Sequence, residues 1–486
     1  MWRCPALGRG GSDAVSDQER TRRAELIRSL PGGVVRATEP GDSEDQRGRR
    51  GLPPLLVTAP RRADEVAAIV RACAQAGVPL IPRGGGTGLV LGQMAMNGPP
   101  PVIVSLERMT AIRAVHTCDN VLIAEAGAIL ADVQQAAKDA NRLFPLSLAA
   151  EGSCRIGGNL ATNAGGLNVL RYGTARDLCL GLEAVLPDGS IWHGLQRLRK
   201  DNTGYDLRNL LIGSEGTLGI ITAAALRIFP RSAHNGTALF VVPSPDAALD
   251  LLNLARDMFG DFISAFELID ATSQHLLAET MPDLRLPFPR IPDWCVLIEL
   301  GTPELLSPEP LFERLFERAL VANLTDDGII AQNGEQASEL WRMREAIPEA
   351  NRLTGGIAFH DISLPTSLVS EFLAQSEAKL REIADVRVGV FGHLGDGNLH
   401  YNVFRAKGRR SADYGDIGNA ISRSVHDLVH EFGGSFSAEH GVGRMKAAEL
   451  ELYADPTRLK ALTAIKTALD PTGIMNPGAV LNDSAA

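Results

Sequence analysis

Hydrophobic positions in residues 61–76 recur with the spacing of one helical face, so this stretch is predicted to form an amphipathic helix. The apolar positions are Val66, Ile69, Val70 and Cys73. Short apolar runs at 55–57 and 78–81 flank this helix and predict strands. Gly77 fits the end of the helix, because glycine is the usual residue just past a last helical turn. The order strand, helix, strand predicts a βαβ unit.

The same patterns predict further elements in two regions of different character. In the first region we expect a helix at 18–29, strands at 101–106 and 121–126, a helix at 129–141 and a hairpin across 182–192 that turns at Asp188-Gly189. In the second region we expect strands at 240–242 and 294–300, and helices at 246–258, 309–323 and 335–347. Glycine-rich loops become rarer after about residue 232, which predicts the main domain boundary there. The last stretch, with turn residues at Pro471, Gly473 and Pro477, is expected to pack back on earlier structure.

A glycine-rich loop, PRGGGTG at residues 82–88, directly follows the second strand. Glycine lacks a Cβ, so the backbone here can approach a ligand closely and direct its N–H groups at phosphate oxygens. A flexible surface turn is the alternative, but the position straight after a buried strand favours anion binding. The dinucleotide fingerprint G-x-G-x-x-G is incomplete, because Leu91 stands where its third glycine would be. A nicotinamide-dependent dehydrogenase is therefore disfavoured.

Two more polar tracts follow. Residues 151–173 contain six Gly and three Asn with few charges, which predicts a long irregular segment lying along an extended polar ligand. A disordered linker is the alternative, and it is disfavoured because Ile156, Leu160 and Leu167 punctuate the tract. The third tract, residues 200–222, is expected to end in a strand.

Residues 391–446 concentrate groups that bind metals or transfer protons, namely His393, His400, Glu439 and His440. His393 and His400 are seven residues apart, a spacing that would put them on opposite faces of a straight strand. The intervening Gly395-Asp396-Gly397 predicts a turn, after which both imidazoles can face one point. Two histidines and a carboxylate suit a divalent metal with open positions, and His440 would then be left to act as a base. On spacing alone, however, this is a weak metal signal.

Composition narrows the classes of function. At 486 residues the chain is long enough for two or three domains, and its 45% hydrophobic and 22% charged content is ordinary for a globular protein. A net charge of −10 without a basic block disfavours nucleic acid as a partner. No apolar run is long enough to predict a membrane span, and acidic residues among the first fifty disfavour a targeting peptide. Six scattered Cys without CxxC spacing disfavour an iron–sulfur cluster, a zinc ribbon or attached haem, and predict reduced thiols in the cytoplasm.

Eight motifs occur in order between about residues 52 and 482: PRGGGTG, GSCRIGGNLATNAGG, RYG, KDNTGYDL, GSEGTLGIIT, GHLGDGNLH, SAEHGVG and GIMNPG. In this order they resemble the FAD-linked D-2-hydroxyacid dehydrogenase family of the vanillyl-alcohol oxidase type. That family includes D-2-hydroxyglutarate dehydrogenase, D-lactate dehydrogenase and the flavin subunit of glycolate oxidase. The stretches GSC before IGGN and RKDNTGYDL are most similar to the 2-hydroxyglutarate branch.

The resemblance implies an α+β fold in four segments. These are an N-terminal polar and helical extension at 1–50, a two-subdomain FAD-binding domain of vanillyl-alcohol oxidase (PCMH) type at 51–232, a substrate-binding domain with a metal site at 233–471, and a tail at 472–486 that returns to the flavin domain. It implies non-covalently bound FAD. The implied cofactor-binding residues are Arg83, Gly84, Gly85, Gly86, Thr87, Gly88, Gly152, Ser153, Gly157, Gly158, Asn159, Thr162, Asn163, Gly165, Ile220 and Asn476.

The resemblance also assigns roles in the second domain. It places a divalent metal, Zn²⁺ or alternatively Mn²⁺, on His393, His400 and Glu439, and it makes His440 the catalytic base. Arg344 and Asn402 fall on substrate-contact positions. Phe359 stands where relatives often carry Lys, and Pro348 where the glutarate enzyme carries Thr, so strict specificity for 2-hydroxyglutarate is in doubt.

The activity implied by the resemblance is oxidation of a D-2-hydroxy acid, of the D-2-hydroxyglutarate or D-lactate type, to the 2-oxo acid. The hydride would pass to flavin N5, and the electrons would pass to an external acceptor such as an electron-transfer flavoprotein, a quinone or a cytochrome. A homodimer is also considered. Two alternatives remain open: a non-catalytic FAD-binding subunit of a glycolate-oxidase-like complex, and an alcohol or aldonolactone oxidase on the same fold.

Overall fold

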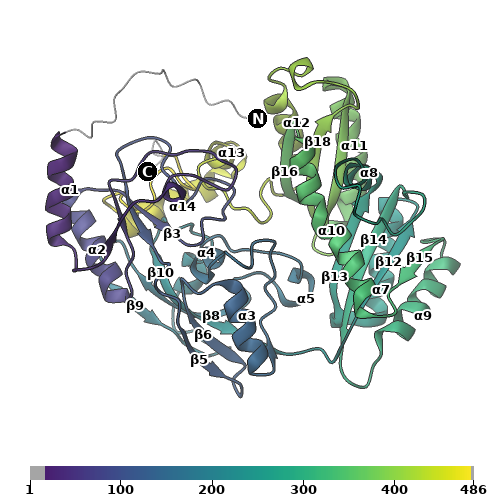
Figure 1. Ribbon diagram of the computed structural model, residues 1–486, viewed down its shortest axis with the longest axis horizontal. Helices are drawn as coiled ribbons and strands as arrows, with labels where there is room; N and C mark the ends of the chain where they lie inside the picture. Colours follow the sequence, from purple (N-terminus) through teal and green to yellow (C-terminus); the bar gives the residue numbers. More distant parts are fainter. Residues whose placement is uncertain (1–16, 483–486) are drawn as a thin grey trace. The chain divides into compact units, whose positions relative to one another are not determined.

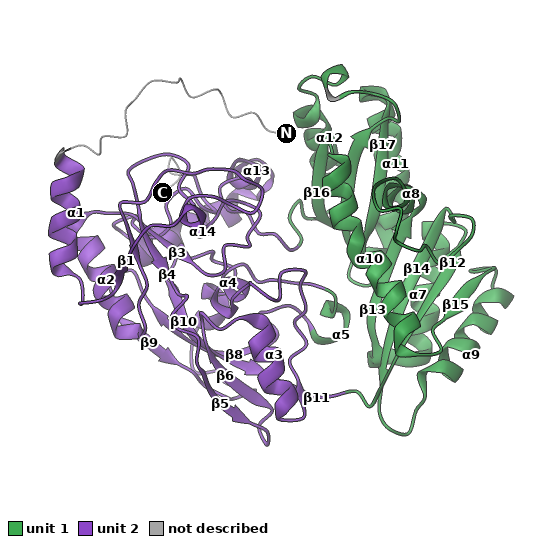
Figure 2. Cartoon of the chain, viewed as in Figure 1, with its two compact units in different colours: residues 1–8, 167–172, 232–438 green, residues 9–166, 173–231, 439–486 purple. Residues whose placement is uncertain are grey.

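In the computed structural model, residues 17–482 are described (Figure 1). They form two compact units (Figure 2): unit 1 comprises residues 167–172 and 232–438, and unit 2 comprises residues 17–166, 173–231 and 439–482. Helices accompany mainly antiparallel sheets, which confirms the predicted α+β class. The limits of the four predicted segments stay a prediction. The start of the predicted N-terminal extension, with Cys4, and the last four residues of the tail lie outside the described residues.

Unit 2 contains a four-stranded sheet in the order β1-β2-β4-β3. Its strands are β1 (Val35–Arg36), β2 (Leu56–Thr58), β3 (Leu80–Arg83) and β4 (Val102–Ser105). Both β2 and β3 run parallel to β4, and α2 (Ala63–Ala76) connects them, so the predicted βαβ unit is confirmed. Gly77 ends α2 with a φ of 58°, a left-handed conformation that glycine adopts without strain. The predicted N-terminal helix is also present, as α1 (Asp17–Ser29).

The second sheet of unit 2 is antiparallel and has the order β5-β6-β10-β8-β9. Its strands are β5 (Ile112–His116), β6 (Val121–Glu125), β8 (Cys179–Val185), β9 (Ile191–Gly194) and β10 (Ile220–Arg227). The remaining elements here are α3 (Leu130–Asp139), α6 (Leu207–Leu211) and the pair β7 (Arg142–Leu143) with β11 (Phe229–Pro230). The predicted hairpin is confirmed as β8–β9, whose turn contains Gly189 with a φ of 78°.

The tract at 151–173 was predicted to be irregular along its whole length, and this is wrong in part. It contains two short helices, α4 (Ile156–Ala161) and α5 (Val169–Tyr172). The helix α4 packs closely on the chain after β6, where a Cβ added to Gly157 would lie 2.7 Å from the Cβ of Ala126. Gly157, one of the glycines on which the prediction of irregular backbone was based, instead allows α4 to pack closely. Helices this short carry no recognisable periodicity.

The C-terminal part of unit 2 comprises α13 (Ala447–Tyr453), α14 (Pro456–Leu469) and the segment that follows them. This segment pairs with the first sheet, because the Leu80 N–H donates to the Ile474 carbonyl at 2.7 Å and the Asn476 N–H donates to the Leu80 carbonyl at 2.8 Å. The predicted return of the chain end to earlier structure is therefore confirmed.

Unit 1 is built on a seven-stranded sheet in the order β15-β12-β14-β13-β17-β18-β16. The strands are β12 (His234–Val242), β13 (Ile263–Asp270), β14 (Trp294–Thr302), β15 (Gly328–Ile330), β16 (Ala358–Ser363), β17 (Val386–His393) and β18 (Asn398–Arg405). The helices, besides α5, are α7 (Pro245–Phe259), α8 (Ala271–Thr280), α9 (Pro308–Val321), α10 (Gly334–Thr354), α11 (Val369–Ile383) and α12 (Gly418–Glu431). No helix among residues 17–482 is long and apolar enough to cross a membrane.

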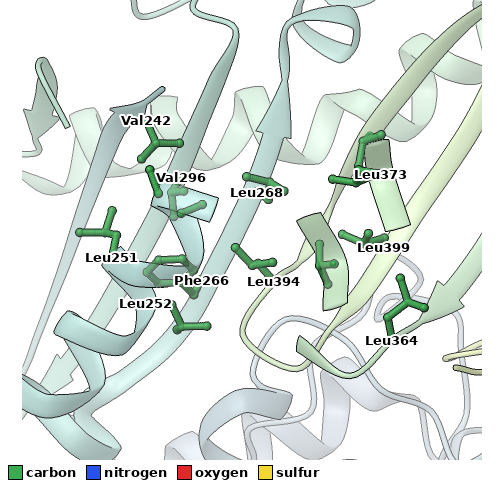
Figure 3. Packing of buried hydrophobic residues seen from close by; sticks show 14 of the residues in the cluster. Val242, Leu251, Leu252, Phe266, Leu268, Val296, Leu364, Leu373, Leu394 and Leu399 are labelled. Carbon is green, nitrogen blue, oxygen red and sulfur yellow. The ribbon is translucent and has the colours of Figure 1, made fainter. Parts of the chain in front are cut away.

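Side chains of this sheet are buried on both of its faces. Along β14, Val296 and Ile298 belong to one core cluster, whereas Cys295 and Leu297 belong to another. Successive side chains of a strand point to opposite faces, so a strand covered on both sides must read as a continuous apolar run. Figure 3 shows Val296 in the first cluster, with Leu251 among its other members.

The helix predicted at 335–347 was expected to stop before Pro348, but α10 continues through this proline to Thr354. Proline removes one backbone donor and normally interrupts a helix. Here Met343, Ile347 and Ala350 are buried in the same core cluster on both sides of the proline. Their burial holds the helix together beyond Pro348, which is a case of tertiary packing overriding local propensity.

Candidate active site

Unit 2 contains a cleft with an empty volume of about 910 Å³, open solvent included. Its walls come from the end of β3 and the glycine-rich loop that follows, from α4, and from the start of β10. Predicted cofactor residues on the walls are Arg83, Gly84, Gly85, Gly86, Thr87, Gly88, Gly157, Gly158, Asn159, Thr162 and Ile220. His440, the predicted base, lines the same cleft. The glycine-rich loop and α4, which are about seventy residues apart in the sequence, are thus brought to one site by the fold.

The cleft fits an anionic cofactor. The guanidinium of Arg83 is held by Asp42 at 2.8 Å, yet its buried Nε has no hydrogen-bond partner among the described residues. A buried donor without a partner is typical of a position that a ligand oxygen fills. A Cβ added to Gly158 would meet no atom within 4 Å, so this residue faces open space in the cleft. These features match the pyrophosphate-containing FAD that the resemblance implies.

Asp42 is the buried anchor of this wall, with an exposed fraction of 1%. Burial by itself raises the pKa of a carboxyl, but the hydrogen bond from Arg36 and the charges of Arg36 and Arg83 hold the pKa of Asp42 below its ordinary value. The carboxylate therefore stays ionised and fixes Arg83 at the mouth of the glycine-rich loop. Nothing in the sequence marked Asp42, because it lies about forty residues before the loop that it supports.

Five predicted cofactor residues, Gly152, Ser153, Asn163, Gly165 and Asn476, do not line this cleft. The Asn163 carboxamide accepts the Arg176 N–H at 3.0 Å, and the Asn476 carboxamide donates to the Gly92 and Glu215 carbonyls. Conversely, Glu215 lines the cleft and was not assigned by the sequence. The motif GSEGTLGIIT, which contains Glu215, was a signal in the sequence from which this residue could have been assigned to the cleft.

The two predicted metal-binding histidines lie together in unit 1. β17 and β18 form an antiparallel hairpin in which Phe391 is paired with His400, so these two side chains share a face. His393 is two residues from Phe391 and shares that face as well. The ring centroids of His393 and His400 are 5.7 Å apart. The predicted turn is confirmed, and Gly397 within it has a φ of 80° and leaves no room for a Cβ beside the Leu364 carbonyl.

A buried carboxylate supports this pair. Glu267 on β13 is paired with His393, and its Oε1 lies 2.6 Å from the Nδ1 of His393. Burial would raise the pKa of Glu267, but the hydrogen bond from His393 and the charge of Arg344 help to lower it to about 2. Because Nδ1 faces this carboxylate, Nε2 is the nitrogen of His393 that would coordinate a metal, and carboxylate support of this kind is usual for metal-binding histidines. The donor set therefore fits a divalent metal.

Arg344 of α10 is held by the same carboxylate. Its Nε and Nη2 both lie 2.7 Å from Oε2 of Glu267, and its guanidinium stacks on the Phe391 ring at 4.7 Å. This edge of the guanidinium is therefore already used. A contact with a substrate carboxylate, which the resemblance implies for Arg344, would use the other edge of the guanidinium, formed by Nη1 and the second N–H of Nη2.

Asn402 and Phe359 lie next to the histidine pair. Asn402 is two residues after His400 on β18 and so shares its face, and Phe359 is paired with Asn402 across the strands. The Phe359 side chain is 47% exposed and packs edge-on against Phe404. The position where relatives often carry Lys is thus filled by an exposed aromatic ring.

Glu439 belongs to unit 2 and follows Ala438, the last residue of unit 1. The carboxylate of Glu439 accepts a hydrogen bond from the Gly166 N–H at 3.0 Å. On the other side of the peptide, the Ala438 N–H donates to the carbonyl of Asp361, which is the strand partner of His400. The residue before Glu439 is therefore bonded to β16, the strand next to the one that carries His400.

Residues 231–480 match the family "FAD linked oxidases, C-terminal domain" and residues 54–194 match "FAD binding domain". The mitochondrial D-2-hydroxyglutarate dehydrogenase of Arabidopsis thaliana is 37% identical over 88% of this chain and 75% of its own length. This chain belongs to the FAD-linked D-2-hydroxyacid dehydrogenase family. Like its family, it is an FAD-dependent oxidoreductase that acts on CH–OH groups.

Other members of the family extend the comparison. The D-2-hydroxyglutarate dehydrogenase of Xanthomonas citri pv. viticola is 36% identical over 91% of this chain and 93% of its own length. A putative mitochondrial D-lactate dehydrogenase of Schizosaccharomyces pombe is 34% identical over 92% of this chain and 86% of its own length. Because several relatives are named mitochondrial, the cytoplasmic location stays a prediction.

Solved structures confirm the predicted fold type. p-Cresol methylhydroxylase covers 97% of this chain and 98% of its own, with a TM-score of 0.74 and 14% identity. A 4-ethylphenol oxidase from Gulosibacter chungangensis covers 98% of this chain and 99% of its own, with a TM-score of 0.71 and 18% identity. At these identities the likeness shows the fold alone.

The open space at Gly158 gives a direct test of the flavin cleft. Gly158→Val is expected to weaken FAD binding by roughly tenfold or more, because a Cβ at this position enters open space in the cleft and the valine methyl groups would extend from it into the volume that FAD would fill. The measurement is FAD affinity from flavin fluorescence, with the melting temperature of the apoprotein as the check on folding. Gly32→Val is the control, since Gly32 also meets nothing within 4 Å but lies outside the cleft. Equal FAD affinity in both variants would remove Gly158 from the site.

Proposed function

We propose that this enzyme oxidises a D-2-hydroxy acid, of the D-2-hydroxyglutarate or D-lactate type, to the 2-oxo acid. The observation that carries the proposal is that His440 lines the flavin cleft. Dehydrogenation of an alcohol needs a proton acceptor next to the hydride acceptor, and a histidine in the wall of a flavin site supplies one. The names of the relatives support the class of substrate.

The chain's own residues would divide the work as follows. Bound FAD, held non-covalently by the cleft, supplies the acceptor for the hydride that leaves C2 of the substrate. His440 accepts the proton of the C2 hydroxyl as the carbonyl forms. One proton and one hydride thus leave the hydroxy acid together, and the 2-oxo acid remains.

We propose His393, His400 and Glu439 as the ligands of a divalent metal, with Zn²⁺ favoured by the imidazole ligands and Mn²⁺ as the alternative. Each of the three side chains offers one ligand atom. Support comes from the Glu267 contact with Nδ1 of His393 and from the Ala438 bond that ties the chain before Glu439 to the strand beside His400. Such an ion would supply Lewis acidity at the substrate oxygens.

Arg344 and Asn402 are proposed to position the substrate carboxylate. Arg344 has a fixed charge and is oriented by Glu267 and Phe391, and Asn402 lies on the face of His400. Preorganised groups of this kind convert binding energy into orientation of the reacting carbon. Phe359 offers no charge to a second carboxylate, so D-lactate and D-2-hydroxyglutarate are both candidates.

The finer points of the proposal concern the partners. Electrons are proposed to pass to an external acceptor, namely an electron-transfer flavoprotein, a quinone or a cytochrome. A cytoplasmic location and a homodimer are retained as proposals. Size-exclusion chromatography with light scattering and cell fractionation would test the last two.

The test of the proposed function is a stereochemically paired substrate panel. D- and L-lactate, D- and L-malate, D- and L-2-hydroxyglutarate and glycolate would be mixed with the purified flavoprotein under anaerobic conditions, and flavin bleaching would be followed. We expect at least one D-acid to bleach the flavin roughly 100-fold faster than its L-enantiomer. When the carboxylate and the hydroxyl of the substrate are both held in place, only one enantiomer directs its C2 hydrogen at the flavin. Bleaching by sugars or alcohols but by no hydroxy acid would contradict the proposal. So would a flavin that no substrate reduces without a partner protein.

A further inference from the structure

Glu215 is a buried carboxylate in the wall of the flavin cleft that the proposed chemistry does not use. Its Oε1 accepts the N–H of Val442 at 2.7 Å, and its Oε2 accepts the N–H of Gly443 at 2.9 Å. These two N–H groups lie two and three residues after His440. One side chain therefore binds two consecutive N–H groups of the segment that follows the proposed base.

The segment after His440 is shaped to receive this carboxylate. Gly441 has a φ of 80°, and a Cβ there would lie 2.7 Å from Oε1 of Glu215. Gly443 has a φ of 50°, and a Cβ there would collide with the Val90 carbonyl at 2.1 Å. Both glycines are thus required by a left-handed backbone and by close approach. The spacing His-Gly-Val-Gly follows from fitting this chain between Glu215 and Val90.

Arg444 and Asn476 close the other side of the same arrangement. The Arg444 guanidinium donates to the Leu91 and Gly92 carbonyls at 3.0 and 3.1 Å and to the Asn476 carboxamide at 2.8 Å. The Asn476 carboxamide in turn donates to the Glu215 carbonyl at 2.7 Å. We call Glu215, Arg444 and Asn476 the His440 clamp. It joins the loop of the flavin cleft, the segment of His440 and the end of the chain.

The conformation of Glu215 is unfavourable by itself. Its φ of 51° is left-handed, which is uncommon for a residue with a side chain. Burial raises the pKa of its carboxyl, against the lowering effect of the hydrogen bonds from Val442 and Gly443. Strained backbone and buried ionisable groups persist where surrounding contacts demand them, and they concentrate at functional sites.

We propose that Glu215 is a positioning residue that holds His440 in register with the bound flavin. This inference rests on the proposed function, in which His440 takes the substrate proton. Glu215 acts through the backbone of Val442 and Gly443, so it should affect the rate of flavin reduction and leave the binding of flavin nearly unchanged.

Glu215→Gln is the main test, because glutamine keeps the size of the side chain but retains a single acceptor oxygen for two N–H groups. We expect flavin reduction by the best D-2-hydroxy acid to slow by roughly 10- to 100-fold, the scale of a small misplacement of a catalytic group. FAD affinity should stay within about threefold. Glu183→Gln is the matched control, since Glu183 is also a buried carboxylate of unit 2 but lies outside the cleft. It should leave the reduction rate nearly unchanged.

The double variant Glu215→Gln with His440→Asn separates a positioning role from a merely structural one. If Glu215 acts through His440, Glu215→Gln should not lower the rate of flavin reduction any further in a protein that already carries His440→Asn. The effects of residues that act as a unit are not additive. Additive losses in the double variant would overturn the inference. An unchanged rate in His440→Asn alone would instead contradict the proposed function.

Glu215→Asp covers the case in which the glutamine variant binds no FAD. Aspartate keeps the charge and both acceptor oxygens but withdraws them by one methylene. It should retain FAD and show an intermediate reduction rate. Loss of FAD in both variants would also overturn the inference, and would assign Glu215 to the flavin cleft itself.

Discussion

His440→Asn is expected to bind FAD as the unchanged enzyme does and to lose turnover by roughly 100-fold or more. Asparagine is close in size to histidine and keeps hydrogen-bonding capacity, but it cannot accept a proton at neutral pH. His440 lies in the wall of the flavin cleft, where a proton acceptor can reach a substrate hydroxyl next to the hydride acceptor. The loss should therefore fall on the rate of flavin reduction.

The measurement is stopped-flow bleaching of the flavin by a saturating D-2-hydroxy acid, together with the FAD dissociation constant. His193→Asn is the matched control, because His193 lies in the same unit on β9, has a side chain that is 73% exposed and does not line the cleft. It should leave the rate within about twofold of the unchanged enzyme. Full activity in His440→Asn would show that another group, or solvent, takes the proton.

Removal of the proposed divalent metal is expected to reduce activity by a comparable factor, roughly 100-fold or more, since Lewis-acid stabilisation of a forming alkoxide is worth several kcal/mol. Dialysis against a chelator should lower the metal content from about one ion per chain to near zero, as read by elemental analysis. Adding Zn²⁺ or Mn²⁺ back should restore activity, and the more effective ion identifies the native preference.

His400→Ala should reproduce this loss irreversibly. Without one imidazole the proposed site keeps two ligands, so metal content should stay low even after Zn²⁺ is added. His430→Ala on the exposed side of α12 is the control and should keep both metal and activity. An enzyme that is metal-free by elemental analysis and still fully active would remove the metal from the mechanism, and His393 would then be a structural residue bound to Glu267.

The sequence alone determined much of this protein. Apolar patterns located α2, α3, α7, α9 and some of the strands, among them β2, β3, β4, β6, β12 and β14, because buried faces must be apolar at the spacing of the element. The glycine-rich loop at 82–88 and the turn at Gly395-Asp396-Gly397 were readable because each needs backbone that only glycine supplies easily. The order of eight motifs identified the family, which the comparisons with relatives then confirmed.

Tertiary structure decided what local pattern could not express. The helix through Pro348 persists because Ile347 and Ala350 are buried together, and α4 forms because Gly157 lets it approach Ala126. The roles of Glu267 and Glu215 could not be predicted from the sequence, although Glu215 lies in a recognisable motif, because each acts on a partner more than a hundred residues away. A carboxylate shows no periodicity and gains a role only from the groups that the fold places within hydrogen-bonding distance.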